Sequence, residues 1–307
     1  MPEELAALAS CRLCPRACGV DRLAGERGWC GAGRLARVAR AALHHWEEPA
    51  ISGSRGSGTV FFARCNLRCL YCQNHEISWG GFGMDLSPSE LAEVFLRLAA
   101  AGAHNINLVT PTPYIPQIAA ALRRARARGL SLPVVYNTGA YELPSSLELL
   151  RGLVDVFLPD LKYADDRLAA AYSDAPGYFA AATAAIRAMR ALAPVDRFAE
   201  DGTMTAGLLV RHLVLPGGVA DTRRVLRWIA AELGPETHVS LMAQYTPVFR
   251  AAGHPVLGRR LRPEEYEAAL AEFFAAGLEN GFCQELAAAR PDFTPAFDLT
   301  GLIGPHG

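Results

Sequence analysis

Six short apolar runs alternate with longer helical patterns along most of this chain, and this alternation constrains the fold more than any other feature. The runs cover residues 59–63, 105–110, 133–138, 154–160, 207–215 and 238–245. The helical patterns cover residues 87–101, 114–128, 144–152, 165–189, 221–232 and 263–276. Continuous Val, Leu and Ile runs are typical of parallel strands that are covered on both faces. The alternation therefore predicts an α/β fold, built as a parallel barrel or an open parallel sheet.

Polar side chains stand where these apolar runs end or in the loops that follow. They are Asn74, Thr110, Asn137, Asp160, Arg211 and Gln244. In parallel α/β folds, the loops after the carboxyl ends of the strands carry the chemistry. We therefore expect these side chains to surround one site.

Seven of the eight cysteines lie in the first 72 residues, in two groups separated by the Gly/Ser-rich stretch 51–58. The first group is Cys11, Cys14, Cys18 and Cys30, and the second is the triad Cys65, Cys69 and Cys72. These groups predict a Cys-rich metal-binding module and linker over residues 1–58, a main domain over 59–280 and a C-terminal extension over 281–307. We expect Cys283, which stands alone, to be a buried small hydrophobic residue.

The composition argues against several classes of partner. Lys and Arg (30) nearly balance Asp and Glu (31), so we expect neither nucleic acid nor an anionic membrane surface as a partner. The first residues lack the basic region and long apolar run of a signal peptide, and no stretch is apolar enough to span a membrane. We therefore expect a cytoplasmic protein, in which clustered thiols bind metal more often than they form disulfides.

The triad follows the first apolar run with C-x3-C-x2-C spacing. Three thiolates at this spacing can hold one [4Fe–4S] cluster and leave one iron without a protein ligand, as catalytic zinc sites keep one position open. The alternatives are a structural zinc with His75 as a further ligand, or three unrelated buried cysteines. The four N-terminal cysteines can saturate a second cluster or a zinc ion, which would be structural or relay electrons, unless these thiols are not ligands at all.

The run FFARCNLRCLYCQN resembles the cluster motif of the radical S-adenosylmethionine (SAM) superfamily. Further segments are similar to the pyruvate formate-lyase activating enzymes, and most of all to their uncharacterised PflX-type relatives: CRLCPRACGVDRLAGERGWC, GAHNINLVTPTPY, PVVYNTGAYE, LPDLKY, VRHLVLPGG and MAQYTP. The resemblance implies a partial (βα)6 TIM-type barrel with a [4Fe–4S] cluster at its open top. It also implies that SAM is cleaved there to methionine and a 5'-deoxyadenosyl radical, which takes a hydrogen atom from a substrate.

The resemblance also implies roles for single residues. The catalytic set is Cys65, Cys69, Cys72 and Lys162, and the cofactor-binding set is Tyr71, Asn74, Thr110, Thr112, Asn137, Asp160, Lys162, Arg211 and Gln244. Asp160 and Lys162 would lie beside the SAM carboxylate, and Asn137 at a position that binds a monovalent cation when it is Asp. Thr110 and Thr112 stand where most radical SAM proteins have Gly-Gly-Glu, which binds the SAM amino group.

Further residues complete this expectation. Arg211 would contact the SAM carboxylate or ribose, Gln244 the ribose or adenine, and Tyr71 would lie near the adenine. For His212 we expect a hydrogen-bonded structural role.

Two classes of function are consistent with the sequence. The first is a radical SAM enzyme that takes hydrogen from a glycine of a partner glycyl-radical enzyme or from a different substrate, with flavodoxin or ferredoxin as reductant. The second is a noncatalytic iron-sulfur or zinc module that transfers electrons. Electron transfer alone requires neither Asp160 nor Lys162, so the sequence favours the enzyme.

Overall fold

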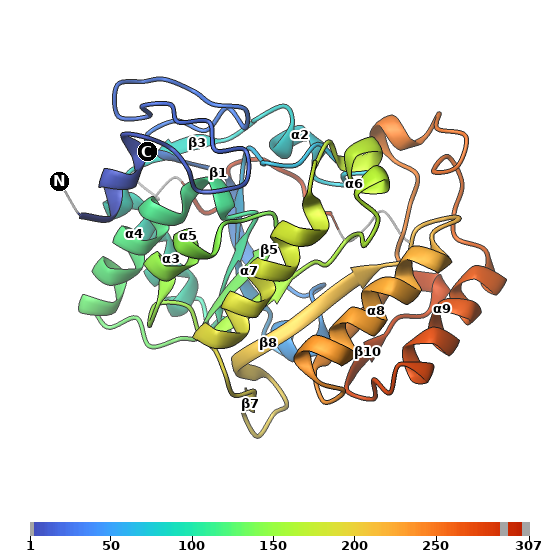
Figure 1. Cartoon of the computed structure of the whole chain (residues 1–307). Helices are drawn as coiled ribbons and strands as arrows, with labels where there is room; N and C mark the ends of the chain where they lie inside the picture. The colour runs from blue at the N-terminus through green and yellow to red at the C-terminus, as the bar shows by residue number, and fades with distance from the viewer. Residues whose placement is uncertain (1–2, 289–293, 303–307) are drawn as a thin grey trace.

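The computed structural model describes residues 3–288 and 294–302 and contains one large sheet (Figure 1). The strands follow the order β10-β9-β8-β6-β5-β4-β2-β1-β3, and β7 pairs with β8 outside this path. Their bounds are β1 Ala36–His44, β2 Ser57–Phe62, β3 Met84–Leu86, β4 Ile106–Val109, β5 Val134–Thr138, β6 Val156–Pro159, β7 Arg197–Phe198, β8 Met204–Leu213, β9 His238–Met242 and β10 Gly281–Cys283.

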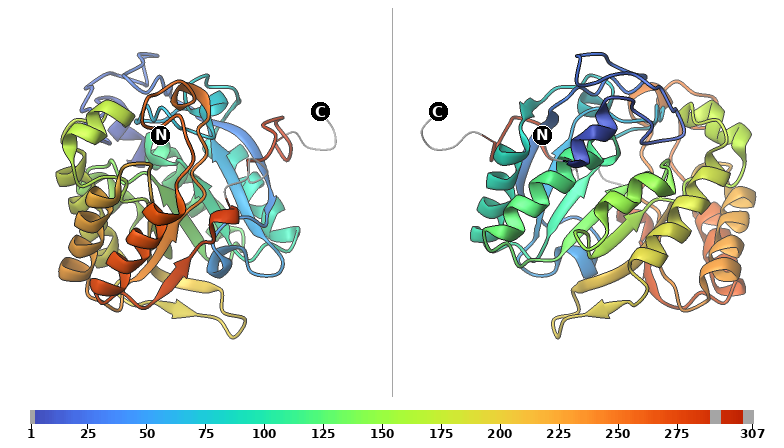
Figure 2. Two further views of the ribbon diagram at one scale, coloured as in Figure 1. Left: turned by 90° about the vertical axis from the view of Figure 1, so that its right-hand side faces the viewer. Right: turned by 60° about the vertical axis from the view of Figure 1, so that its left-hand side comes forward.

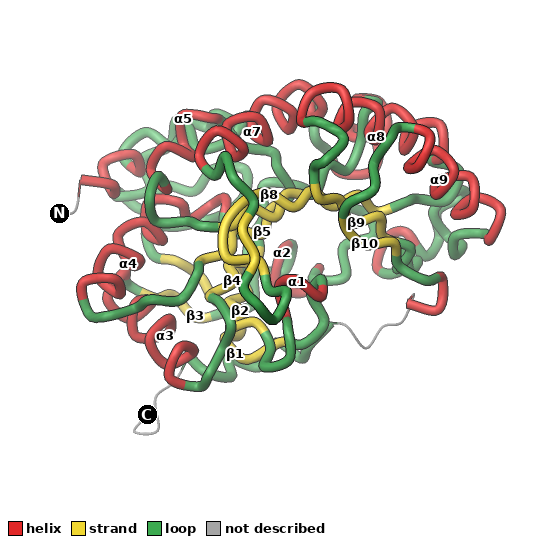
Figure 3. The backbone as a smooth tube through the Cα atoms, turned by 90° about the horizontal axis from the view of Figure 1, so that it is seen from below, coloured by secondary structure: helices red, strands yellow, loops and turns green. Residues whose placement is uncertain are grey.

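The six predicted strands correspond to β2, β4, β5, β6, β8 and β9, which are neighbours in this order and parallel throughout. The predicted parallel α/β fold is therefore confirmed. Among the described strands no pairing joins the two ends of the sheet. Figure 3 shows that the sheet curves into an arc with the larger helices on its outer side, so the barrel is partial.

The larger helices are α3 Pro88–Ala100, α4 Ile115–Ala127, α6 Asp166–Ser173, α7 Tyr178–Leu192, α8 Val219–Leu233 and α9 Pro263–Ala275, and the short ones are α1 Pro49–Ser52, α2 His75–Ser78 and α5 Pro144–Leu147. Helix α3 lies within the helical range predicted over residues 87–101, and a capping box between Ser87 and Glu90 forms its start. The single helix expected over 165–189 is wrong. It is divided into α6 and α7 because Asp174 and Gly177 adopt left-handed backbone conformations, with φ of 45° and 63°, on either side of Pro176.

Several strands were not predicted. β1 lies inside the segment assigned to the N-terminal module, yet it pairs antiparallel with β2 and β3. β10 lies in the segment assigned to the C-terminal extension and pairs with β9. Strands β7 and β8 form a hairpin that projects below the sheet (Figure 2). These strands are short, or interrupted by Arg as in β1, and so lack the continuous apolar runs that marked the others.

Helix α1 lies on the concave side of the arc (Figure 3). Its Ala50 and Ile51 are buried in one cluster with Val135, Leu158 and Leu209, which come from three barrel strands. This short helix therefore closes one end of the barrel interior. The larger core lies between the sheet and the outer helices and includes Phe62, Phe95, Tyr136, Phe157, Ile186 and Leu226. No helix within the described residues is both long and apolar enough to cross a membrane.

Candidate active site

A pocket opens inside the barrel because inward-facing strand positions change from apolar to polar near the strand exits. Alternate residues of a strand face the same side. Val135, Leu158 and Leu209 pack inside the barrel, and two residues later on the same strands stand Asn137, Asp160 and Arg211. These three polar residues line the pocket, and an isolated bridge joins Asp160 and Arg211. The sequence predicted that polar side chains at the strand exits surround one site, and Asn137, Asp160 and Arg211 do line one pocket.

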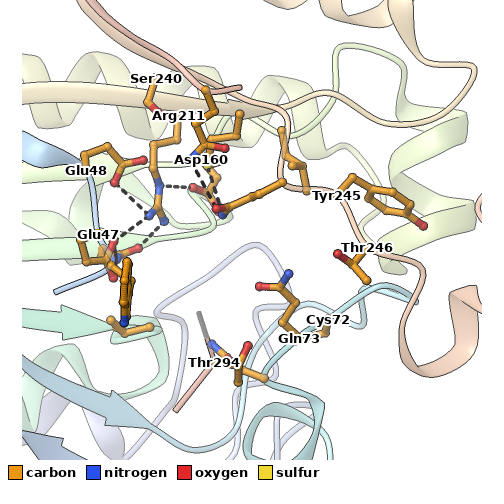
Figure 4. A pocket seen from close by; sticks show the side chains of 18 of the residues that line it. Glu47, Glu48, Cys72, Gln73, Asp160, Arg211, Ser240, Tyr245, Thr246 and Thr294 are labelled. Carbon is orange, nitrogen blue, oxygen red and sulfur yellow. Dashed lines mark hydrogen bonds and ion pairs between the residues drawn. The ribbon is translucent and has the colours of Figure 1, made fainter. Parts of the chain in front are cut away.

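Arg211 is the centre of a buried network of charges. Its Nε donates to Asp160 Oδ1 at 2.7 Å, and its Nη1 donates to Glu47 Oε2 at 3.1 Å. Nη1 also lies 3.6 Å from Glu48 Oε2, and Nη2 donates to Asn137 Oδ1 at 2.5 Å. Figure 4 shows these side chains converging at one end of the pocket. Arg211 therefore already has three carboxylate partners, and its expected contact with SAM stays a prediction.

Lys162 shares Asp160 with Arg211. Its Nζ lies 2.6 Å from Asp160 Oδ2, and both side chains are only 16% exposed. Burial acts to raise the pKa of Asp160, but Arg211 and Lys162 outweigh it and hold the pKa below its usual value. Asp160 is therefore ionised at neutral pH and holds the two cations at the pocket wall.

At Glu47, in contrast to Asp160, the effect of burial on the pKa outweighs that of the neighbouring cation. Burial raises the pKa of Glu47 from the ordinary 4.5 to about 7, Arg211 opposes this rise, and Glu48 and Asp160 add to it. Asn137 donates to both oxygens of Glu47, at 3.2 and 3.3 Å. Glu47 consequently takes up and loses its proton near neutral pH.

The cysteine triad lies beside this pocket. Cys69 and Cys72 line it, and Cys65 packs against the main core. Ser173 donates a hydrogen bond to Cys69 Sγ at 3.0 Å, and the hydroxyl of Ser78 lies 3.2 Å from Cys72 Sγ. Burial raises the pKa of Cys65 to about 12 and that of Cys72 to about 11, so without a metal both remain thiols at neutral pH.

The donor chemistry of the triad fits a cluster. Hydrogen bonds to sulfur are among the contacts that tune iron-sulfur centres, and a bound metal deprotonates a thiol outright. Across residues 3–288 and 294–302, no three His, Cys, Asp or Glu side chains surround one point as ligands of a single ion would. His75, the alternative zinc ligand, places Nδ1 3.2 Å from Cys72 O and stacks on Phe249.

The four N-terminal cysteines all line a second, smaller cavity. Arg22 is buried beside them, with Nη1 3.8 Å from Cys11 Sγ, and it also donates to Pro113 O at 2.7 Å in the loop after β4. The backbone NH of Trp29 donates to Cys18 Sγ at 3.4 Å, and Arg68 Nη2, from the triad loop, donates to Trp29 O at 3.3 Å. The two cysteine groups are therefore joined through Trp29 and Arg68.

The remaining predicted residues divide into two sets. Tyr71, Asn74 and Gln244 line the pocket as expected. Thr110 and Thr112 do not belong to its described lining. Thr110 has a positive φ of 61°, and Thr112 is buried, where its hydroxyl donates to Glu142 Oε1 at 2.6 Å.

Two further expectations concern residues outside this pocket lining, His212 and Cys283. His212 is buried and hydrogen-bonded as expected, with its ring nitrogens 2.7 Å from Leu161 O and 2.9 Å from Thr222 Oγ1. Cys283 was expected to be buried and is exposed, because it lies on the short edge strand β10.

Sequence reasoning missed Glu47, Glu48 and Ser240, which all line the pocket. The two glutamates follow β1, in the segment 1–58 that was assigned to a metal-binding module and linker. Two adjacent acidic residues directly before Pro49 were the available signal. Ser240 lies in a run read only as a strand, and its register opposite Arg211 becomes visible only in the sheet.

Comparison with known proteins relates this chain to one family model, one curated protein and several solved structures. Residues 59–205 match the family model described as the Radical SAM superfamily. "Uncharacterized protein MJ0674" of Methanocaldococcus jannaschii is 29% identical over 271 residues, which cover 85% of this chain and 73% of that protein. Streptococcus suis SuiB, in its structure bound to precursor peptide SuiA, matches 74% of this chain with a TM-score of 0.50 and 13% identity, a likeness of fold alone.

The matched region covers 48% of SuiB, so this chain spans about half of that protein's length. A domain of a pyruvate-formate lyase-activating enzyme from Bacteroides vulgatus matches 56% of this chain and 92% of that domain, with a TM-score of only 0.39 and 12% identity. The family model is therefore the most informative of these comparisons. Residues 59–205, which contain the cysteine triad, Asp160 and Lys162, match the Radical SAM superfamily model.

Proposed function

We propose that this protein is a radical SAM enzyme in which Cys65, Cys69 and Cys72 hold a [4Fe–4S] cluster beside the barrel pocket. One observation carries this proposal: two thiols of the triad line the same pocket as Asp160 and Lys162, inside the region that matches the superfamily. When bound and reduced, the cluster would supply the electron that cleaves SAM into methionine and the 5'-deoxyadenosyl radical.

The protein's own residues would bind SAM and shield the reaction. Burial acts to lower the pKa of Lys162, but Asp160 and, after it, Cys69 outweigh this effect and raise the pKa, so Lys162 stays charged. It would attract the SAM carboxylate while Asp160 holds it in place. Tyr71 is buried, with its hydroxyl 2.6 Å from that of Tyr163 and its ring 5.8 Å from that of Tyr245. These rings would exclude water from the reacting atoms.

For the hydrogen donor, we propose a glycine of a partner enzyme, or a different substrate that enters the same pocket. The sequence similarity to activating enzymes supports the glycine, and flavodoxin or ferredoxin would act as reductant. For Cys11, Cys14, Cys18 and Cys30, we propose a second closed metal site, an iron-sulfur cluster or zinc. The contacts through Trp29 and Arg68 support a role in electron relay or in supporting the triad loop.

Product analysis tests the proposed function. The protein is reconstituted anaerobically with iron and sulfide, reduced with dithionite and incubated with SAM, and we expect 5'-deoxyadenosine. Cys69→Ala should abolish the product, whereas Cys283→Ala, which removes an exposed cysteine outside the site, should leave it unchanged. Well-loaded, reduced protein that forms no 5'-deoxyadenosine would support the noncatalytic alternative instead.

A further inference from the structure

Carboxylates outnumber cations in the described lining of the pocket. The carboxylates are those of Glu47, Glu48 and Asp160, and the cations are Lys162 and Arg211. His44 also lines the pocket, but burial and, to a smaller extent, His45 and Arg40 lower its pKa to about 4, so it is neutral at physiological pH. When Glu47 is ionised, the described wall therefore has one negative charge more than its own cations can balance, and a bound cation would favour this ionised form.

The contacts show where this excess lies. Asp160 takes the shortest ion pairs of both cations, at 2.6 and 2.7 Å. Glu47 is 3.1 Å from Arg211, and Glu48 is 3.6 Å away. Glu48 is 4% exposed at its side chain, and its Oε2 makes no hydrogen bond within the described residues. A buried carboxylate oxygen is normally hydrogen-bonded, so this atom lacks a donor.

A second polar atom in the same wall also lacks a partner. Ser240 is fully buried on β9, directly opposite Arg211 in the sheet, and its Oγ has no hydrogen-bond partner in the part of the chain that the structure describes. A serine hydroxyl can accept hydrogen bonds from N–H groups. Ser240 and Glu48 thus offer unused acceptors, from different elements, to one pocket.

These acceptors are held firmly in place. Glu47 and Glu48 directly precede α1, whose Ala50 and Ile51 are buried against the barrel strands. Figure 4 shows both glutamates on one side of the pocket and Cys72 on the other. The glutamates therefore lie away from the triad, where a ligand other than the cluster would meet them.

We infer that Glu47 and Glu48, assisted by Ser240, bind a positively charged nitrogen group of the substrate, an ammonium or a guanidinium. Such a group donates several charge-assisted hydrogen bonds and supplies the missing positive charge. This inference rests on the proposed function and names the chemical class of its substrate. The group belongs either to a small amine or to a Lys or Arg side chain of a protein substrate.

Binding measurements test this inference independently of turnover. Cluster-loaded, full-length protein with SAM present is titrated anaerobically by calorimetry with n-butylammonium and with the neutral n-butanol. A second pair of probes is the blocked peptide acetyl-Gly-Lys-Gly-amide and its norleucine counterpart. In one of the two pairs, we expect the charged probe to bind at least tenfold more tightly than its neutral counterpart. Selectivity for n-butylammonium would indicate a small amine as substrate, and selectivity for the Lys peptide would indicate a side chain of a protein substrate.

Substitutions assign the effect to the glutamates. Glu47→Gln combined with Glu48→Gln should weaken binding of the charged probe by about tenfold to a hundredfold, the range expected for charge-assisted hydrogen bonds. Glu264→Gln, an exposed glutamate at the start of α9, is the matched control and should change nothing. If the double variant fails to fold, each single variant and Ser240→Ala are used, with losses of several-fold expected.

The binding and product assays distinguish three outcomes. Equal binding of charged and neutral probes by the unmodified protein would overturn the inference. An equal loss of SAM affinity in the double variant would also overturn it, because the glutamates would then belong to the SAM site. Absence of 5'-deoxyadenosine together with charge-selective binding would reject the proposed function while the glutamate site itself stands.

Discussion

Glu47→Gln should change how the stability of this protein depends on pH. In the folded chain the charged groups around Glu47 are Arg211, Glu48 and Asp160, with the Asn137 amide as hydrogen-bond donor. Burial raises the pKa of Glu47 to about 7, against an ordinary value of 4.5. Between these two pH values the folded state binds more protons at this site than the unfolded state does. The free energy of unfolding of the natural protein therefore falls as pH rises through this window.

The size of this effect follows from the two pKa values. At about 1.4 kcal/mol for each pH unit, a rise from 4.5 to about 7 corresponds to about 3 kcal/mol of stability, present below pH 4.5 and lost above pH 7. Glutamine cannot ionise, so Glu47→Gln removes this loss. With about 2.1 cal/mol/K of unfolding entropy for each of 307 residues, 1 kcal/mol changes Tm by about 1.6 °C.

The assay is anaerobic thermal unfolding of both proteins, equally loaded with cluster, from pH 5 to pH 8. We expect the Tm of the variant, relative to the natural protein, to rise by about 4 °C over this range, because all other titrations cancel in the difference. Glu264→Gln, on the surface, should show a constant difference. A difference for Glu47→Gln that stays constant, or that falls with pH, would refute the reasoning.

Three further predictions concern other parts of the structure. Asp160→Asn leaves two buried cations without their shared carboxylate and should lower the free energy of unfolding by about 3–5 kcal/mol, measured as a fall in Tm of about 5–8 °C. Gly28→Ala places a Cβ 2.8 Å from Cys18 Sγ and should reduce the metal bound by the N-terminal cysteines, measured as total metal per chain. The SAM-dependent spectral changes of the triad cluster should persist in this variant. Ser87→Ala removes the α3 capping box and should cost about 1 kcal/mol in thermal unfolding without changing SAM cleavage.

The sequence predicted those parts of the fold that depend on local patterns. Apolar runs marked six parallel strands, and inward-facing positions at their exits marked Asn137, Asp160 and Arg211. Side-chain direction within loops was not predictable in the same way. Thr112 follows the left-handed residue Thr110 and is buried against Glu142, so a residue at a strand exit does not line the pocket. This placement accompanies a left-handed backbone conformation at Thr110 and a hydrogen bond to Glu142, and neither follows from the residue types at the strand exit.

Glu47 and Glu48 were missed for a different physical reason. Their placement depends on contacts between segments that lie far apart in the chain, since α1 is buried among β5, β6 and β8. The Gly/Ser-rich stretch 51–58, which begins within α1, made residues 1–58 look separable from the barrel. The structure shows that β1 pairs with β2 and that Ile51 is fully buried in the barrel interior.

The segment from β1 to α1 therefore has two roles that cannot be separated. It closes one end of the barrel with apolar side chains and, in the two residues just before the helix, places carboxylates against Arg211. Burying two ionised glutamates beside an aspartate is unfavourable unless positive charge compensates them. The described wall contains only two cations, so without a bound cation Glu47 takes up a proton near neutral pH. A substrate cation would complete this balance, so the charge distribution favours a ligand that is positively charged at the closed end of the barrel, away from the cysteine triad.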